Sequence, residues 1–135
     1  MLVQLKYATL PFPLGLFAVH YWFTVLDAAG GRCDRWEIWQ SKQAGGESVG
    51  HLHCNLKAPD AGVGGGPARV HAEWRGADAL RIAEVLRKSE TAYPHVHRYL
   101  PWPGPNSNTF AAWVLREAGI ALELPPQAIG KNFRV

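Results

Sequence analysis

Apolar and polar residues alternate along the first half of the chain, a period-two pattern that predicts β-strands. The strongest such segment runs from residue 16 to residue 26 and is largely apolar on both faces. A strand of this kind is buried from both sides, so it is predicted to lie at the centre of a sheet, with His20 in an otherwise apolar row. One face would carry Phe17, Val19, Tyr21, Phe23 and Val25, and the other Leu16, Ala18, His20, Trp22, Thr24 and Leu26.

Weaker alternation predicts the rest of an antiparallel sheet. Residues 2–8 are expected to form an edge strand, because Pro11 and Pro13 follow closely. The glycines and prolines of residues 58–67 predict a loop. Further strands are predicted at residues 35–40, 48–56 and 69–74.

The two later strands indicate a meander with one covered face and one partly wet face. In each, apolar side chains alternate with polar ones. The apolar rows are Leu52, Cys54 and Leu56, then Val70, Ala72 and Trp74; the polar rows are His51, His53 and Asn55, then Arg69, His71 and Glu73.

The period changes from two to that of a helix after Gly76. A first helix is predicted to about Glu90, and residues 93–105, which contain four prolines, are predicted to form an irregular aromatic loop. A second helix would end at Gly119, and residues 124–135 would form an extended strap. Strands first and helices afterwards predict one α+β domain over residues 1–135. The predicted core positions are Leu80, Ala83 and Leu86, flanked by Ala79, Ile82 and Val85, in the first helix, and Phe110, Ala111, Val114, Leu115 and Ala118 in the second.

Composition narrows the classes of function. The chain has 135 residues, of which 47% are hydrophobic and 19% charged, values typical of one folded domain. The net charge of +3 comes from scattered basic residues, so nucleic acid is not an expected partner. No run approaches the roughly 20 apolar residues of a spanning helix, so no membrane association is expected and a cytoplasmic location is the default. Cys33 and Cys54 form no C-x-x-C motif; buried free thiols are the first expectation, and their pairing stays open.

Ser107 is the first candidate for chemistry, because residues 104–110 (GPNSNTF) deliver it to the start of the second helix. Free N–H groups there favour a developing negative charge and would hold an oxyanion. A serine nucleophile needs a base, and His20 is the candidate, with Glu37 on the next strand to orient the imidazole. The structural alternative is a cap, since Asn106, Ser107 and Asn108 are all residue types favoured at N-caps.

Other motifs give weaker signals. His51, His53 and His71 would be the ligands of a metal site, but no fourth ligand is evident and no metal is predicted. Residues 62–67 (GVGGGP) lack the spacing of a phosphate-binding loop. Most tryptophans are expected in the core, whereas Trp102, between two prolines, is expected to be exposed.

Several segments resemble the bacterial family of domains of unknown function numbered 3750. The resemblance spans almost the whole chain and implies no established activity. It rests on Phe17–His20 with Trp22-Phe23, WEIW (36–39), Gly50–Leu52, GVGGGP (62–67), Tyr93-Pro94, WPGPNSNTF (102–110) and LPPQAIGK (124–131).

A looser resemblance is to circularly permuted papain-like (NlpC-type) hydrolases and acyltransferases, in which a strand histidine precedes an N-C-N-x-F segment that enters a helix. It implies a papain-like α+β fold with Ser107 as nucleophile, His20 as base and Glu37 as orienting residue. Ser107 stands where that family has cysteine. The resemblance thus implies either a serine-type amide or ester hydrolase or acyltransferase, or a papain-like shell that binds without cutting, in which Ser107 only caps the helix.

The ligand is expected to be a small or peptide-like molecule, with no cofactor, and the oligomeric state stays open. The residues expected to contact substrate are Asn106, Asn108 and Trp102.

Overall fold

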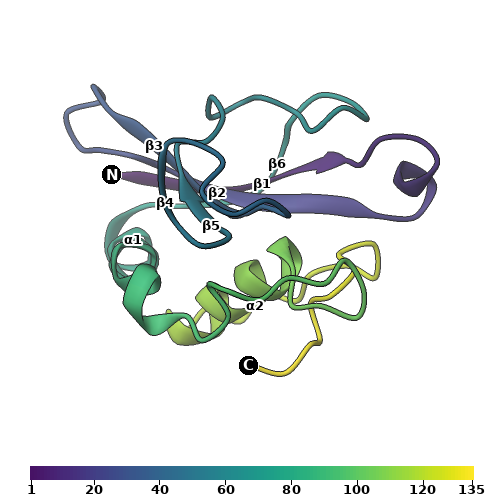
Figure 1. Ribbon diagram of the computed structural model, residues 1–135. Coiled ribbons are helices and arrows are strands. Elements are labelled where there is room, and N and C mark those ends of the chain that lie inside the picture. Colours follow the sequence, from purple (N-terminus) through teal and green to yellow (C-terminus); the bar gives the residue numbers. More distant parts are fainter.

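A computed structural model describes all 135 residues as an α+β fold, in which two helices lie below one six-stranded antiparallel sheet (Figure 1). The predicted α+β class is confirmed. The sheet has the order β4-β5-β3-β2-β1-β6, so the first three strands form a meander and β6 crosses to the far edge. The elements are β1 (Leu2–Thr9), the short 3-10 turn η1 (Leu14–Leu16), β2 (Val19–Leu26), β3 (Cys33–Ile38), β4 (Glu47–Val49), β5 (Leu52–Cys54), β6 (Arg69–Trp74), α1 (Gly76–Ala92) and α2 (Ser107–Glu117).

The interior position predicted for the strongest strand is correct, since β2 lies between β1 and β3. The edge position predicted for the first strand is wrong, because β6 pairs with the free side of β1. The prediction relied on Pro11 and Pro13, which follow the strand, and on the weak alternation of β1 itself. That weakness has another cause: Leu5 faces the helices while Lys6, on the opposite face, is also buried and ion-paired with Asp60.

The single strand predicted over residues 48–56 is a hairpin of two short strands, β4 and β5. The chain turns at Gly50, whose φ of +59° is the left-handed conformation that glycine adopts most readily. A Cβ atom at this position would also lie 2.2 Å from the carbonyl oxygen of Val96. The turn pairs Val49 of β4 with Leu52 of β5. The alternating pattern of residues 48–56 therefore comes from two strands and not from one.

The main hydrophobic core lies between the sheet and the two helices. Every stripe position predicted for α2 is buried, and Gly119, with φ +72°, follows the end of the helix as expected. In α1 the prediction for Leu80 is wrong, because its side chain is 58% exposed. The buried face of α1 is rotated toward Ala79, Ile82, Ala83, Leu86 and Ser89.

The opposite face of the sheet is partly wet, as predicted, since Arg69 and Glu73 of β6 are exposed. Over β2 and β3 this face is polar but covered by the loop that follows β5. Trp22 donates its Nε1–H to the carbonyl of Pro59 at 3.0 Å. Arg35, fully buried, donates from Nη1 to the carbonyls of Ala58 and Ala61 at 2.9 and 2.7 Å. The loop of residues 58–67 thus covers buried polar side chains of the sheet. The alternation of apolar and polar residues along the strands cannot predict this contact.

A β-bulge in β6 changes one predicted face. Leu5 pairs with Ala72 while Lys6 pairs with Val70, so one residue of β6, His71, has no partner of its own. Val70 therefore lies on the opposite face from Ala72, and the predicted common row is wrong there. The bulge lets His71 reach the helix-covered face, where its Nδ1 lies 2.8 Å from the hydroxyl of Tyr21.

Candidate functional site

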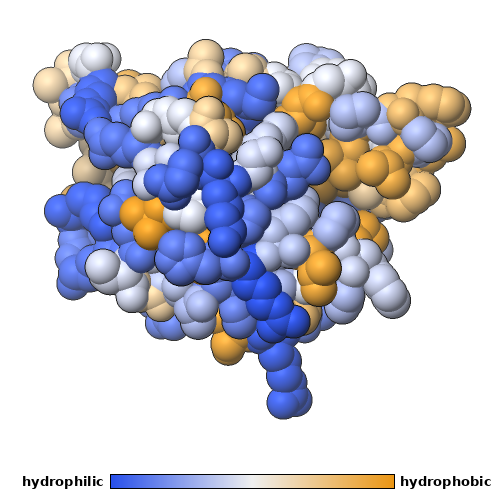
Figure 2. Space-filling model, viewed as in Figure 1, coloured by the Kyte–Doolittle hydropathy of each residue, from blue (hydrophilic) through white to orange (hydrophobic).

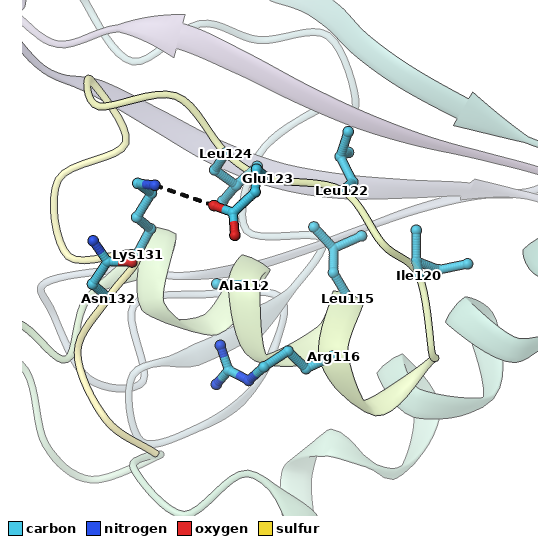
Figure 3. Close-up of a pocket in the computed structure, with 9 residues that line it drawn as sticks. All are labelled: Ala112, Leu115, Arg116, Ile120, Leu122, Glu123, Leu124, Lys131 and Asn132. Carbon is cyan, nitrogen blue, oxygen red and sulfur yellow. Dashed lines mark hydrogen bonds and ion pairs between the residues drawn. The ribbon is translucent and has the colours of Figure 1, made fainter.

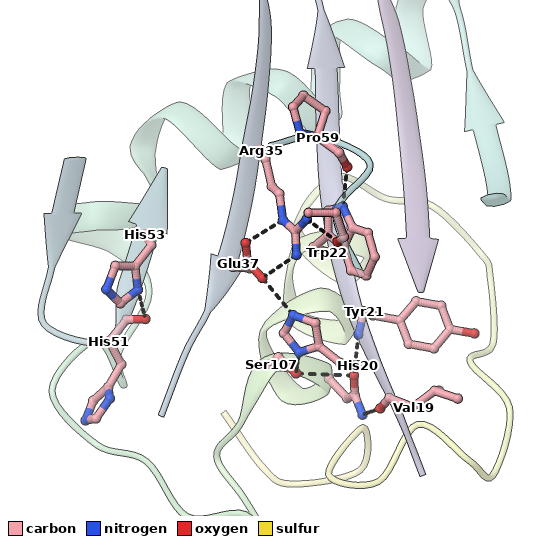
Figure 4. A network of polar contacts seen from close by, with 12 residues as sticks. Val19, His20, Tyr21, Trp22, Arg35, Glu37, His51, His53, Pro59 and Ser107 are labelled. Atoms are coloured by element: carbon pink, nitrogen blue, oxygen red, sulfur yellow. Dashed lines mark hydrogen bonds and ion pairs between the residues drawn. The ribbon is translucent and has the colours of Figure 1, made fainter. Parts of the chain in front are cut away.

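Ser107 is the first residue of α2, and it lies against the beginning of β2 (Figure 4). Its Oγ is 2.7 Å from Nδ1 of His20. The other ring nitrogen of His20, Nε2, is 2.7 Å from Oε1 of Glu37. The structure therefore brings together all three residues that the sequence analysis selected, His20 and Glu37 from the neighbouring strands β2 and β3 and Ser107 from the distant helix α2.

One neutral tautomer of His20 satisfies both of its hydrogen bonds. Ionised Glu37 is an acceptor only, so Nε2 of His20 carries the hydrogen and donates it. Nδ1 is then the acceptor, and the hydroxyl of Ser107 donates to it. A neutral imidazole that accepts the serine proton is the ground-state geometry of a general base. In Ser-His-Asp proteases Nε2 faces the serine; here the imidazole is reversed and presents Nδ1.

Arg35, together with His20, keeps Glu37 ionised. Its Nε lies 2.5 Å from Oε2 of Glu37 and its Nη2 lies 3.0 Å from Oε1, a bidentate pair in which both side chains are fully buried. Burial alone would raise the pKa of Glu37, but the hydrogen bonds from His20 and Arg35, together with the charge of Arg35, outweigh burial and lower it. The guanidinium also stacks on Trp22, with Cζ 4.0 Å from the ring centroid.

Sequence reasoning missed Arg35, although one signal was available. Arg35 and Glu37 are two residues apart on a predicted strand, so their side chains share a face with His20 and Trp22. A second charged residue beside a proposed orienting carboxylate is a reason to expect a buried ion pair.

The cap of α2 is Asn106, not Ser107. Oδ1 of Asn106 accepts from the N–H groups of Asn108 and Thr109 at 3.0 and 3.2 Å, and the Thr109 hydroxyl accepts from the Asn106 N–H in return. The alternative in which Ser107 caps the helix is therefore wrong. Because Asn106 caps the helix, the hydroxyl of Ser107 is not needed for capping.

The cap also changes the expected oxyanion donors. Of the helix-start N–H groups, those of Asn108 and Thr109 are already bonded to Asn106, and that of Phe110 bonds to the carbonyl of Asn106. The N–H of Ser107 makes no hydrogen bond within the protein. One backbone donor, rather than several, thus stays available beside the hydroxyl.

The two asparagines that were expected to contact substrate have their amide groups engaged by the protein. Nδ2 of Asn106 donates to the carbonyls of Pro101 and Ile129, each at 2.9 Å. Asn108 accepts from the N–H of Tyr21 at 3.0 Å and donates to the carbonyls of Val19 and Ile129. Asn108 thereby fixes the start of α2 to the start of β2, which sets the distance between Ser107 and His20. Contact of these asparagines with substrate stays a prediction.

A cavity of about 590 Å³ opens beside Ser107 and His20. Ser107 is only 8% exposed, so a reactant reaches its hydroxyl through this cavity. The walls come from the loop before β2, the end of β3, the aromatic loop and residue Ile129. Trp102 belongs to the wall and is 76% exposed, in agreement with the exposure predicted for it.

A second cavity, of about 100 Å³, lies between α2 and the C-terminal segment (Figure 3). Leu115, Ile120 and Leu122 form its apolar side, and Lys131 and Glu123 form an ion pair across its edge at 3.4 Å. It contains no nucleophile paired with a base, so the candidate site is the larger cavity.

The histidines of the metal alternative do not come together. His51 and His53 lie at β5, near one edge of the sheet, whereas His71 lies in β6 at the other. Burial lowers the pKa of His53, although its hydrogen bond to the carbonyl of His51 acts in the opposite direction. No group of three or more His, Cys, Asp or Glu side chains is placed to hold a metal ion.

Cys33 and Cys54 are both free thiols, so the disulfide that the sequence left open is not formed. Burial raises the pKa of Cys54 to about 12, and that of Cys33 also lies above its usual value. Neither is an activated thiolate that could replace Ser107 as nucleophile.

Over residues 1–133 the chain matches the model of the family described as "Protein of unknown function (DUF3750)". Neither a curated protein nor a solved structure gives a significant match. None of the helices is long and apolar enough to cross a membrane.

Proposed function

The chain belongs to this family of proteins of unknown function, and we propose from its own residues that it is a serine-type hydrolase or acyltransferase acting on esters or amides. The observation that carries the proposal is the chain of hydrogen bonds from Ser107 through His20 to Glu37, at the wall of a cavity. The looser resemblance to permuted papain-like enzymes agrees with it, with serine in place of cysteine.

In the first half of the reaction Oγ of Ser107 attacks the carbonyl carbon of the substrate, and its proton moves to Nδ1 of His20. The carbonyl oxygen becomes an oxyanion, for which the N–H of Ser107 is the available backbone donor. When the tetrahedral intermediate collapses, the leaving alcohol or amine takes the proton from His20. Ser107 then carries the acyl group as an ester.

In the second half a water molecule, or an acceptor alcohol or amine, attacks the acyl ester. His20 removes the proton of this second nucleophile and returns it to Oγ of Ser107. Glu37 keeps the imidazole in the tautomer that accepts at Nδ1 and stabilises the imidazolium formed in each half. Arg35 is a positioning residue, because it acts through Glu37 and touches no reacting atom.

A fluorophosphonate probe tests the proposal, because it forms a covalent bond with an activated serine. We expect wild-type protein to gain the mass of one probe, with peptide mapping placing it on Ser107. Ser107→Ala should remain unlabelled, while the exposed Ser41→Ala, a matched serine removal outside the cavity, should be labelled at the wild-type rate.

Labelling that persists in Ser107→Ala, or a folded wild-type protein that stays unlabelled, would contradict a catalytic role for Ser107. The second outcome would favour the class of non-catalytic binding modules, with the cavity as its ligand site. Circular dichroism of each variant establishes that a lost signal is not lost folding.

A further inference from the structure

The large cavity has an unusual lining for a hydrolase site, because His20 is its only titratable side chain apart from the phenol of Tyr99 and the hydroxyl of Ser107. None of its lining residues is lysine, arginine, aspartate or glutamate. Phosphates, sugar acids and charged peptide side chains are recognised in proteins by such groups. A charged substrate would therefore have no partner along these walls.

A peptide substrate also fits poorly. Each residue of a bound peptide brings an N–H and a carbonyl that need partners when water is removed. The amides of Asn106 and Asn108 are already bonded to the protein, as described above. Gln40 is the remaining side-chain amide of the wall.

The apolar walls instead suit a flexible hydrocarbon chain. Eleven of the eighteen lining residues are hydrophobic, and the volume of about 590 Å³ lies within the range of about 300–1,000 Å³ usual for small-molecule sites. Ser107 and His20 lie in the same wall, so a carbonyl held at Ser107 would leave its attached chain within the apolar part. Among the hydrophobic lining residues, Leu14, Phe17 and Trp102 are exposed at the outer part of the cavity.

The apolar surface continues outward from the cavity. Leu14 and Phe17 of the wall are about half exposed, and Phe12 and Leu16 of the same loop are more exposed still. Figure 2 shows this loop as an orange patch at the right of the molecule, on a surface that is otherwise mostly blue or pale. Contiguous exposed apolar residues on a small protein mark a site of contact with an apolar ligand or partner.

We infer that the cavity is an acyl-chain site, so that the substrate is an ester or amide of an aliphatic carboxylic acid whose chain lies along Leu14 and Phe17. The inference rests on the proposed function for the reaction at Ser107. The binding of the acyl chain, in contrast, depends only on the cavity and needs no reaction at Ser107. The substrate can enter the cavity as a dissolved molecule or from a lipid surface. In both cases the cavity recognises the same aliphatic acyl chain.

Hydrolysis of p-nitrophenyl esters of increasing chain length, each below its micelle concentration, tests the inference. From acetate through butanoate and octanoate to dodecanoate, kcat/KM should rise by up to about fourfold for each methylene that enters the cavity, and then level off. Leu14→Ser should lower the octanoate-to-acetate ratio of kcat/KM roughly tenfold. Leu80→Ser is the matched control, because Leu80 is equally exposed but lies on α1, and its ratio should equal that of wild type.

A second measurement separates the two proposals. Ser107→Ala protein, which has no nucleophile, is titrated with the uncharged methyl esters of dodecanoic and acetic acid while tryptophan fluorescence is followed. Saturable binding of one methyl dodecanoate per protein molecule, weakened by adding Leu14→Ser and not by adding Leu80→Ser, supports the acyl-chain site even if Ser107 fails to react with fluorophosphonate. A flat chain-length profile together with a reactive Ser107 overturns the acyl-chain site and leaves the proposed reaction standing.

A third experiment identifies where the acyl chain of the substrate comes from. The dodecanoate ester is supplied either as a dissolved monomer or within neutral phosphatidylcholine vesicles. A Leu14-dependent rate in either form supports the inference and identifies the source, and a rate that is independent of Leu14 in both forms overturns it.

Discussion

Replacing Glu37 by glutamine removes one charge and almost no volume from the centre of the buried network. Arg35 then keeps its charge in a place that water does not reach, without a carboxylate partner. Breaking a buried ion pair in this way costs about 3–5 kcal/mol of unfolding free energy. The new amide also has to point two hydrogens at groups that are themselves donors, Nε and Nη2 of Arg35 or Nε2 of His20.

The charge explanation predicts a non-additive double-mutant cycle. Arg35→Met alone leaves Glu37 as the uncompensated charge, although His20 still donates to it. With both substitutions neither charge remains, and the oxygen of the glutamine can accept from His20. The double variant should therefore lose less stability than the two single losses combined, by about 1–3 kcal/mol.

Urea unfolding followed by the fluorescence of the six tryptophans measures these free energies. Additivity of the cycle within about 0.5 kcal/mol, or a loss below about 1 kcal/mol in Glu37→Gln, would refute the view that the ion pair is coupled and desolvated. Arg35 also holds the loop over the sheet through two carbonyls, and that part of its effect should survive in the double variant.

The same variant has a defined pH dependence. The pKa of Glu37 is below its ordinary value of 4.5 in the folded protein, so its contribution to stability is complete above about pH 4.5 and is lost as the pH falls through the lower folded value. The stability difference between wild type and Glu37→Gln should therefore shrink in acid. A difference that grows as the pH falls would contradict a carboxylate stabilised in its ionised form.

Three further predictions concern other parts of the fold. The lowered pKa of His53 means that the unfolded chain takes up a proton first, so stability should fall as the pH drops below about 6.5; His53→Gln should remove that component in urea titrations at several pH values. Gly130→Ala should destabilise by more than about 1 kcal/mol, because φ is +97° and the new Cβ would lie 2.3 Å from the Asn106 side chain, whereas Gly31→Ala, which meets nothing within 4 Å, should be neutral or stabilising; equal melting temperatures would contradict this. The hydroxyl of Tyr93 is buried without a hydrogen-bond partner, so Tyr93→Phe should leave stability unchanged or raise it by about 1 kcal/mol, and a clear loss on thermal unfolding would mean that the hydroxyl has a partner.

The elements with strong internal periodicity could be predicted from the sequence. The apolar stripe of α2 and the two apolar faces of β2 are properties of consecutive residues, and each repeat reports which side will be buried. The loop of residues 104–106 and the helix start at Ser107 were predictable for the same reason, since proline, glycine and asparagine act on the backbone next to them. The pairing of Ser107 with His20 followed from these positions together with a resemblance.

The errors arose where a distant segment decides the outcome. β1 became an interior strand because β6 crossed the sheet to reach it. Leu80 is exposed because the face of α1 that packs into the core is the one that carries Ala79, Ile82 and Leu86. No local pattern carries this information.

The features of the candidate site also separate into those set by local sequence and those set by the folded structure. The sequence by itself determined which groups can do chemistry, a serine at a helix start and a histidine on an apolar strand, because these depend on residue type and local conformation. Only the tertiary structure decided that the Ser107 hydroxyl meets His20, and that His20 and Arg35 both donate to Glu37. It also decided that the surrounding cavity carries no lysine, arginine or carboxylate, because its walls come from segments that meet only in the folded chain.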